Sequence, residues 1–495
     1  MIRLAKDIAT HVPSSLRKKR AYQLIRREVV HEPPADSPTF ILNEEQEHIY
    51  DLIVNEGKSV FYTGAAGTGK SKLLGRIIEG LQYKYGNAPV AVTAPTGIAA
   101  LNIGGTTVHR FSQFPVNAQY KSIEEIISAI KFSKRLSTRW NRIRALVIDE
   151  ISMLDARLFE RLDAVAKYFK KNQDPFGGIQ IVVTGDFCQL PPVSTEDKAR
   201  FCFESPIWSD CIRHNYQLTK IYRQKNEDFQ NILNELRIGQ VSENSLEIMN
   251  QLSRTPAYPE DGVKPSELYP IISKVNRINR IELDRLPHKK YIFHAEDFEP
   301  ENIGKLDELE RSNLAPKKLE LKLNAQVMLI TNLSDDLVNG SKGYVCGYHS
   351  IKDQMNYKEE LDQMDVDTKY ILPIVRFDNG LIRPIPYLSW TINSTDDKTG
   401  ESVELAKRVQ LPLILAWAIS IHKSQGQSLE RVKVDLDRIF ERGQAYVALS
   451  RARTMDYLQV LNFSRDKVMA DEKVLNFYRT LETAKTTNIK GTTAC

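Results

Sequence analysis

A glycine-rich segment that ends in a lysine and a serine is the strongest chemical signal in the sequence. Residues 64–71 read G-A-A-G-T-G-K-S, which matches the phosphate-binding pattern G-x-x-x-x-G-K-[ST] at every fixed position. Backbone N–H groups of such a loop surround a nucleotide phosphate at the positive end of the following helix. Lys70 would add a charge at the β- and γ-phosphates, and the Ser71 hydroxyl would bind Mg²⁺.

Two adjacent acids, Asp149 and Glu150, supply the second half of this chemistry. They follow the apolar run L-V-I at residues 146–148, and α/β sheets bind ligands at the carboxyl ends of such strands. Asp149 would hold Mg²⁺, while Glu150 would orient the attacking water and accept its proton. Together the two motifs predict hydrolysis of ATP with Mg²⁺ as the metal cofactor.

A parallel sheet is needed to bring these motifs together, and the sequence pattern predicts one. Short apolar and β-branched runs occur at residues 59–63, 90–93, 145–148 and 179–184, and they alternate with longer amphipathic stretches. The pattern returns at residues 413–421, 432–436 and 458–461, whereas residues 241–410 contain short strands and irregular acidic loops. The predicted fold class is therefore α/β, with two domains of parallel strands and crossover helices and a β-rich insertion in the second.

The predicted domain boundaries follow from these changes of pattern. A basic extension and linker at residues 1–39 precede a first ATPase domain at 40–205, which includes a small wedge region near 110–140. The second domain begins with residues 206–290, is interrupted by the β-rich insertion at 291–410, and continues at 411–480. Residues 481–495 are predicted to be a disordered tail.

Composition excludes several other classes of protein. Hydrophobic residues make up 42% and charged residues 26% of the 495, which is ordinary for a globular chain. No run approaches the roughly 18 apolar residues of a membrane helix. The five cysteines form no C-x-x-C pair, so no zinc or iron–sulfur site is indicated. Residues 1–30 hold eight Lys/Arg and two acids, which leaves the rest of the chain nearly neutral. Because the chain after residue 30 has almost no net charge, a nucleic-acid site in it must be a local groove.

Further segments carry residues suited to a phosphate sensor or to a polynucleotide. Residues 93–100 follow a predicted strand and place hydroxyls and backbone donors where sugar–phosphate contacts are possible. Residues 104–111 add a polar loop that contains one aromatic residue, Phe111. Gln189 ends another strand with an amide that could sense a γ-phosphate. Arg223 and Arg451 lie beyond the first domain, and an arginine brought from a second domain couples closure to hydrolysis. Taken alone, each arginine is more often part of a surface ion pair.

Jointly these segments resemble the petite-integration-frequency DNA helicases, which are relatives of RecD in helicase superfamily one. The resemblance covers residues 42–463 and includes L-N-E-E-Q at 42–46, T-A-P-T-G-I-A-A at 93–100 and I-S-I-H-K-S-Q-G at 419–426. The F-G-G-I-Q segment at residues 176–180 is similar to the fungal-type members in particular. The resemblance implies two RecA-like P-loop domains, with a small β-barrel inserted in the second.

The family pattern also implies a role for each matching residue. Gln46 would read the adenine, and Gln189 would act as the phosphate sensor. The catalytic set would be Lys70, Asp149, Glu150, Gln189, Arg223 and Arg451. The nucleotide would contact Gln46, Gly64, Ala65, Ala66, Gly67, Thr68, Gly69, Lys70, Ser71, Arg223, Gly426 and Arg451. Single-stranded DNA would contact Pro95, Thr96, Gly97, Thr107, His109, Phe111, His422, Lys423 and Ser424. The metal ligands would be Ser71 and Asp149.

The same resemblance implies an ATP-dependent helicase that moves 5′ to 3′ on single-stranded DNA. Its implied substrates are forked DNA, RNA–DNA hybrids and G-quadruplexes, in DNA repair, recombination, and telomere or mitochondrial DNA maintenance. The expected address is the nucleus, the mitochondrion or both, with no membrane partner, and the expected state is a monomer that can dimerise on DNA. Residues 1–39 fit an organelle presequence, a nuclear-import patch or a solvated extension.

Departures from the family pattern are few. Arg110 stands where the family usually has serine, residues 112–113 replace a small-glycine pair, and Asn226 occupies a usually acidic position. None of them touches the phosphate chemistry. Three alternatives stay open from the sequence: an RNA-directed ATPase, a strand-binding module without catalysis, and an ATP-driven remover of bound proteins.

Overall fold

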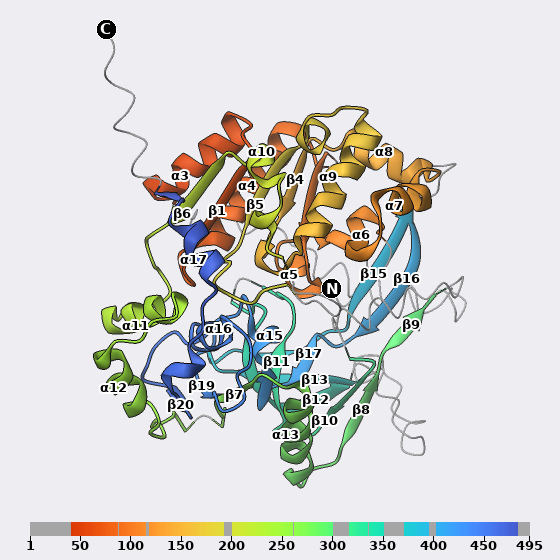
Figure 1. Ribbon diagram of the computed structural model, residues 1–495. Coiled ribbons are helices and arrows are strands. Elements are labelled where there is room, and N and C mark those ends of the chain that lie inside the picture. The colour runs from red at the N-terminus through yellow and green to blue at the C-terminus, as the bar shows by residue number, and fades with distance from the viewer. Residues whose placement is uncertain are drawn as a thin grey trace, which may run out of the picture. The chain divides into compact units, whose positions relative to one another are not determined.

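The computed structural model describes most of the chain (Figure 1). The described residues are 41–87, 89–114, 118–192, 200–260, 262–299, 316–334, 336–350, 371–395 and 402–483. From Glu44 onward they belong to one unit. The predicted extension at residues 1–39 lies outside the described ranges, and so do residues 484–495 of the predicted tail. The beginning of that tail, predicted to be disordered from residue 481, is instead ordered, because residues 482–483 form a strand.

Seven parallel strands form the sheet of the first domain, in the order β21-β6-β1-β5-β4-β2-β3. They are β1 (Val60–Gly64), β2 (Val90–Ala94), β3 (Thr106–Thr107), β4 (Ala145–Ile148), β5 (Gln180–Thr184), β6 (His214–Leu218) and β21 (Glu482–Thr483). Every residue of the central strands β1, β5 and β4 is buried, as expected for parallel strands covered on both faces. The four strands predicted for this domain are confirmed.

The first sheet extends past the predicted domain boundary at residue 205. Strand β6 pairs with β1 from Val60 to Gly64, and β21, near the other end of the chain, pairs with β6. Local patterning does not reveal this arrangement because β6 is a short strand with alternating burial and β21 has two residues. The last described segment therefore returns to the first domain instead of ending the second.

The helices of the first domain follow local capping and packing signals. They are α3 (Glu44–Tyr50), α4 (Lys70–Tyr85), α5 (Gly97–Asn102), α6 (Val108–Ser112), α7 (Ile123–Ile130), α8 (Lys134–Arg142), α9 (Ala156–Lys170) and α10 (Trp208–Cys211). Short turns of π or 3₁₀ type are η1 (Asp51–Asn55), η2 (Ala118–Tyr120), η3 (Ile151–Met153), η4 (Pro175–Gly178) and η5 (Cys202–Glu204). Asp155 caps α9 by accepting from the Arg157 N–H at 2.8 Å. Figure 1 shows α6, α7 and α8 within the predicted wedge region.

Four parallel strands form the second sheet, in the order β18-β7-β19-β20. They are β7 (Ser266–Tyr269), β18 (Ala418–Ser420), β19 (Val432–Asp435) and β20 (Leu458–Leu461). The helices of this part are α11 (Glu227–Arg237), α12 (Glu243–Gln251), α13 (Ile272–Arg285), α15 (Ile421–Ser424), α16 (Gln444–Leu449) and α17 (Glu472–Tyr478), with the turn η8 (Arg465–Lys467). Among the described residues, no helix is both long and apolar enough to cross a membrane.

The strand predicted at residues 413–421 is split between two sheets. Strand β17 (Leu413–Leu415) pairs antiparallel with β11 of the insertion, whereas β18 pairs parallel with β7. The Ala416 N–H donates to Gln326 O at 3.0 Å, so the chain crosses from one sheet to the other at Ala416 and Trp417. Continuous apolar character made these two short strands look like one.

The insertion is β-rich, as predicted. Its strands are β8 (Tyr291–His294), β9 (Glu296–Phe298), β10 (Lys318–Leu321), β11 (Gln326–Leu329), β12 (Lys342–Ser350), β13 (Ile371–Phe377), β14 (Ile382–Pro384), β15 (Leu388–Thr395) and β16 (Ser402–Gln410). They form an antiparallel sheet β14-β13-β12-β11-β17, the pair β10-β8 and the sheet β15-β16-β9. In the described residues the edge strands β14 and β17 do not pair with each other, so the five-stranded sheet is open.

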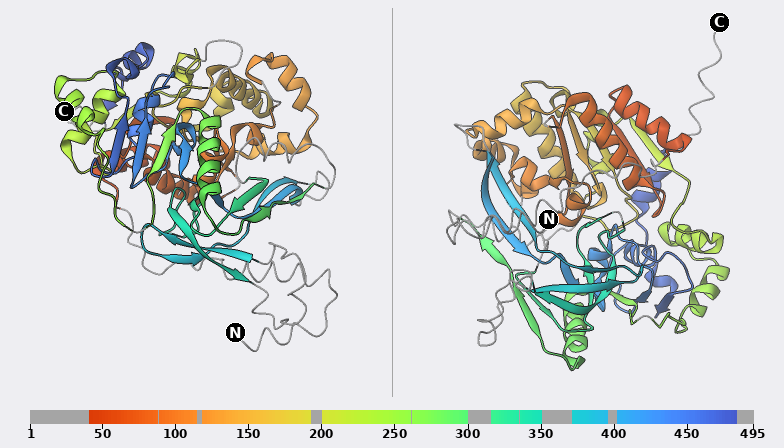
Figure 2. Two further views of the ribbon diagram at one scale, coloured as in Figure 1. Left: turned by 90° about the horizontal axis from the view of Figure 1, so that it is seen from below. Right: turned by 180° about the vertical axis from the view of Figure 1, so that it is seen from behind.

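A long hairpin of the insertion reaches the first domain. Strands β15 and β16 extend away from the five-stranded sheet toward α6 and α7 (Figure 1, Figure 2). There the Arg110 Nη2 group of α6 donates to the backbone oxygen of Thr391 at 3.0 Å. Arg110 is one of the residues that depart from the family pattern, and this contact gives it a partner in the insertion.

Candidate active site

Two residues predicted to bind the nucleotide, Gln46 and Arg223, lie so close to the glycine loop at residues 64–71 that the loop has no room for side chains there. Gly67 has a φ of +90°, and a Cβ atom there would lie 2.6 Å from the Arg223 Cβ. A Cβ on Gly69 would lie 2.9 Å from Nε2 of the buried Gln46. Only glycine combines this backbone conformation with so close an approach. The structure therefore places the predicted adenine reader and one predicted arginine directly against the loop.

Lys70 begins α4 and folds back over the loop. Its Nζ donates to the backbone oxygens of Gly64 at 2.7 Å and Ala65 at 3.2 Å. Burial lowers the pKa of Lys70, while the charges of Asp186 and Glu150 act in the opposite direction. The ammonium group thus has acidic neighbours at the phosphate loop, as the predicted role requires.

Asp149 and Glu150 follow β4, and their backbone is held in an unusual shape. Glu150 has a φ of +49°, which is uncommon for a non-glycine residue and recurs at functional sites. Its N–H donates to Asp149 Oδ1 at 2.8 Å, and its Oε2 accepts from Gln425 Nε2 at 3.0 Å. Burial, with the adjacent Glu150 charge, raises the pKa of Asp149. The predicted base therefore already contacts a residue of the second domain.

The predicted metal ligands suit Mg²⁺. Ser71 lies in the first turn of α4 with an exposed side chain, and Asp149 follows β4. Strands β1 and β4 both pair with β5, which brings their carboxyl ends to the same edge of the sheet. The described residues contain no cluster of three or more His, Cys, Asp or Glu side chains that could hold a metal. Mg²⁺ would therefore take most of its oxygen ligands from the nucleotide and water, as it commonly does.

Arg223 and Arg451 lie on either side of Ser450. Arg223 Nη1 donates to Ser450 O at 3.1 Å, while Arg451 Nε donates to Val447 O at 2.9 Å on α16. The Arg451 residue is 2% exposed. Burial lowers the pKa of both arginines, and the Arg451 charge lowers that of Arg223 further. The partly buried Arg223 at the glycine loop and the buried Arg451 next to it form a place where an anion would be stabilised.

Buried amide atoms next to the loop also fit a polar ligand. Within the described part of the chain, Gln224 Oε1 and Gln425 Oε1 are buried without a hydrogen-bond partner. Such atoms are uncommon in folded proteins. Gln224 Oε1 lies 2.9 Å from where a Cβ on Gly67 would stand, which puts it beside the phosphate loop. The loop N–H groups, Lys70 and the arginines fit the phosphates of a nucleoside triphosphate, whereas these two amide oxygens can only accept and would suit a water or a hydroxyl group.

Gln189 lies in the loop after β5 and is 6% exposed. Its backbone oxygen and that of Cys188 would each stand 2.5 Å from a Cβ on Gly443, the residue before α16. The predicted sensor loop therefore packs tightly against the helix that leads to the predicted arginine finger. Gly426, which was predicted to contact the nucleotide, lies beside Asn102 of α5 in the first domain.

Two polar residues of this region were not predicted. The Tyr446 hydroxyl accepts from the Ala66 N–H at 2.8 Å and lies 3.3 Å from Asp186 Oδ2. Asp186 is fully buried and forms an ion pair with Arg237, in which Nη2 and Oδ1 are 3.0 Å apart. An acid two residues after a buried strand was a usable signal for Asp186. Tyr446 lies in an apolar run and gave none.

Several predicted DNA contacts gather at one edge of the first sheet. Pro95 and Thr96 follow β2, Gly97 begins α5, and Thr107 ends β3, which pairs with β2. His109 lies in α6 and is half-buried. The predicted strand contacts of the first domain therefore lie together at the carboxyl ends of β2 and β3.

Phe111 and Ser424, which are also predicted to contact DNA, have buried side chains. The Phe111 residue is 5% exposed, and its ring centroid lies 5.0 Å from that of Trp140. The Ser424 hydroxyl donates to Ile421 O at 2.8 Å inside α15. Phe111 belongs to the hydrophobic core, and Ser424 serves its own helix, so neither side chain is available to a strand in this arrangement.

The other two predicted contacts on α15 are more accessible. His422 Nε2 lies 3.4 Å from Glu441 Oε2, and its side chain is 32% exposed. Lys423 is half-buried, and this partial burial lowers its pKa. These side chains keep basic groups near the surface of the second domain.

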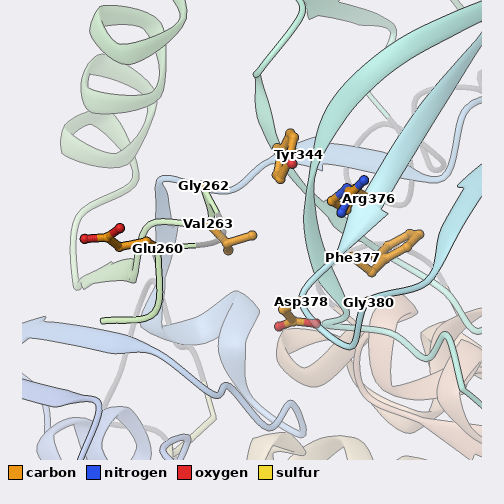
Figure 3. A pocket seen from close by; sticks show the side chains of 8 residues that line it. All are labelled: Glu260, Gly262, Val263, Tyr344, Arg376, Phe377, Asp378 and Gly380. Atoms are coloured by element: carbon orange, nitrogen blue, oxygen red, sulfur yellow. The ribbon is translucent and has the colours of Figure 1, made fainter. Parts of the chain in front are cut away.

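A cavity of about 440 Å³ lies outside the predicted site. Figure 3 shows it between the loop before β7 and strands β12 and β13 of the insertion. Its lining residues are Glu260, Gly262, Val263, Tyr344, Arg376, Phe377, Asp378 and Gly380. None of the predicted site residues lines it, so it marks the junction of insertion and second domain.

The fold and the site define a class of protein. A P-loop, a following acid pair and two arginines, one of them on a second parallel-sheet domain, are the parts of a two-domain ATPase motor. Comparison with known proteins makes the assignment specific. The family model described as PIF1-like helicase matches residues 41–247, and the one described as DNA helicase Pif1, 2B domain, matches residues 306–348.

Individual relatives agree. The chain is 40% identical to the ATP-dependent DNA helicase RRM3 of Saccharomyces cerevisiae, over 91% of this chain and 69% of that protein. A crystal structure of Pif1 helicase from Candida albicans is 42% identical with a TM-score of 0.75, and the match covers 90% of this chain and 100% of that one. A structure of two coordinating Pif1 helicases at forked DNA is 28% identical with a TM-score of 0.60, and covers 89% and 97%.

The chain belongs to the PIF1-like helicases and is by family an ATP-dependent DNA helicase. The predicted family, the α/β fold with two RecA-like domains and the enzyme class are confirmed. The chain spans 69%, 64% and 62% of the full lengths of three curated relatives.

Proposed function

We propose that this chain uses ATP and Mg²⁺ to move 5′ to 3′ along single-stranded DNA and to unwind forked duplexes. The observation that carries the proposal is the position of Arg451 and Arg223. Arg451 lies on the second domain, Arg223 lies against the phosphate loop of the first, and they meet at Ser450. A triphosphate bound there would draw both domains together, and its hydrolysis would release them.

Each predicted site residue would have a separate role in ATP hydrolysis. Lys70 and the loop amides would hold the phosphates, and Ser71 and Asp149 would hold Mg²⁺, which supplies charge neutralisation at the phosphates. Glu150 would accept the proton of the attacking water. Its hydrogen bond to Gln425 at 3.0 Å connects this base to the segment that follows α15. Hydrolysis is thereby linked to the element that carries His422 and Lys423.

Movement along DNA needs grips on both domains that change with the nucleotide. The first grip is proposed at the edge formed by Thr96, Thr107 and their neighbours, and the second at His422 and Lys423. Asn102 of the first domain accepts from Asn339 Nδ2 of the insertion at 2.8 Å. The insertion therefore contacts the first domain close to the proposed strand path and is well placed to clamp a strand.

The finer substrate assignments rest on the family resemblance. RNA–DNA hybrids and G-quadruplexes are proposed as further substrates, in DNA repair, recombination and the maintenance of telomeric or mitochondrial DNA. The nucleus, the mitochondrion or both are the proposed address. A monomer that pairs on forked DNA is proposed, because one related structure is described as two coordinating Pif1 helicases at a fork.

Phosphate release stimulated by single-stranded DNA tests the proposal. Lys70→Ala and Glu150→Gln should abolish stimulated turnover, whereas Lys72→Ala should not, because Lys72 is exposed on the same helix. Survival of stimulated turnover in both site variants would refute the site. DNA and RNA oligonucleotides of one sequence separate a DNA motor from an RNA-directed ATPase. DNA binding without any phosphate release would favour a strand-binding module.

A further inference from the structure

One tyrosine hydroxyl connects the phosphate loop to the second domain. Tyr446 lies on α16, is 1% exposed, and accepts a hydrogen bond from the Ala66 N–H at 2.8 Å. The same hydroxyl donates to Asp186 Oδ2 at 3.3 Å. Residues 66 and 446 are 380 positions apart in the chain. A single polar group therefore joins the phosphate loop, the loop after β5 and α16.

Asp186 fixes the direction in which this hydroxyl points. Burial alone would raise the pKa of Asp186, but Arg237 and Lys70 hold it below its ordinary value. The carboxylate also accepts from Tyr478 at 2.9 Å. An ionised carboxylate can only accept hydrogen bonds, so the Tyr446 proton must point toward it. The lone pairs of the Tyr446 oxygen are then left for the Ala66 N–H.

The position of α16 decides where Arg451 lies. Gly443, just before the helix, packs closely on the Gln189 backbone. A Cβ atom added to Gly443 would lie 2.5 Å from the Gln189 backbone oxygen. Just beyond the end of α16, Arg451 Nε donates back to Val447 O at 2.9 Å. A helix turn is stiff, so a shift of Tyr446 relative to the phosphate loop moves Arg451 with it.

We propose that Tyr446 is a positioning residue that sets the register of α16 against the phosphate loop and so aims Arg451 at the γ-phosphate. The inference rests on the proposed ATPase function and extends it. A displacement of about 1 Å can cost about 10²-fold in rate. Loss of the hydroxyl should therefore lower kcat 10- to 100-fold, while direct ATP affinity changes by less than about threefold, since Tyr446 is not one of the predicted phosphate contacts.

The matched pair of variants is Tyr446→Phe and Tyr478→Phe. Both remove a hydroxyl that donates to Asp186, but only Tyr446 also contacts the phosphate loop. Tyr478 instead bonds with Thr63 and with the Phe187 N–H, so its loss is at least as demanding for stability. The full chain is assayed for DNA-stimulated kcat, for KM, for direct ATP binding and for melting temperature.

The expected result is a low kcat with near-normal ATP binding for Tyr446→Phe, and a kcat within about twofold of wild type for Tyr478→Phe. Equal kcat values for Tyr446→Phe and wild type would overturn the inference, as would equal losses in both variants, which would indicate a structural role. A wild-type chain without DNA-stimulated turnover would instead contradict the proposed function itself.

Hydrogen exchange of the wild-type chain provides a test that does not depend on the folding of a variant. The Ala66 N–H should exchange slowly without nucleotide, because it is hydrogen-bonded to Tyr446. Fast exchange of this amide in an otherwise protected β1–α4 segment would show that the contact is not maintained, and would overturn the inference.

Discussion

Replacement of Arg451 by alanine should separate ATP binding from ATP turnover. Arg451 lies on the second domain and is predicted to act on the γ-phosphate when the domains close. Loss of an arginine finger lowers turnover by about 10³ or more, which corresponds to about 4 kcal/mol in the activation free energy. ATP affinity should change little, because the phosphate loop, Lys70 and Gln46 lie on the first domain.

The structure indicates which side effect must be controlled. Arg451 also donates to the backbone oxygens of Val447 at 2.9 Å and Gln427 at 3.2 Å, so its removal loosens the packing between α15 and α16. Arg451→Lys keeps the positive charge but not the forked geometry, and should recover stability more than turnover. Arg453→Ala is the matched control, because this nearby side chain is 57% exposed and forms an ion pair with Glu430 at the surface.

Nucleotide titration and steady-state phosphate release, measured side by side on all three variants, provide the assay. Arg453→Ala should retain both ATP affinity and turnover. Equal losses of affinity and turnover in Arg451→Ala would refute the finger role, and so would a fall in turnover that follows the fall in melting temperature across the series.

The remaining predictions concern stability, the metal and the insertion. Arg237→Ala leaves the buried Asp186 charge unpaired, which costs about 3–5 kcal/mol and should lower the melting temperature by about 6–20 °C in a thermal scan. Because the Asp186 pKa is lowered in the folded state, its ionised form stabilises the fold above the unfolded value of about 3.9. The free energies of unfolding of wild type and Asp186→Asn should therefore become more similar as the pH falls below that value. A difference that stays constant with pH would contradict the stabilising role of the ionised Asp186. Chelation by EDTA should abolish phosphate release and Mg²⁺ should restore it; turnover that persists in EDTA would exclude the metal role. Arg110→Ser should increase hydrogen exchange in residues 388–391 of β15, and unchanged exchange would mean that the bond to Thr391 does not hold the hairpin.

Features encoded by neighbouring residues could be predicted from the sequence. The phosphate loop, the acid pair and the buried strands β1, β4 and β5 each occupy one short segment, and the structure places them as expected. Helix α9 is also encoded locally, since its apolar residues recur at helical spacing and form one buried face. Local pattern was sufficient wherever the partners of a residue lie within one supersecondary unit.

Polar contacts between residues far apart in the chain could not be predicted from the sequence. Asp186 and Arg237 are 51 positions apart, and Ala66 and Tyr446 are 380 apart, so no local periodicity connects them. The packing of Phe111 on Trp140 could not be predicted either, because an aromatic residue in a polar loop fits stacking on a base equally well. Only the fold distinguishes these cases.

The most direct test of the two-domain motor is strand separation of forked duplexes with a single 5′ or 3′ tail. With ATP and Mg²⁺, the wild-type chain should separate the 5′-tailed duplex and leave the 3′-tailed one intact, and Lys70→Ala should separate neither. Equal separation of both duplexes, or separation that continues without ATP hydrolysis, would contradict the account.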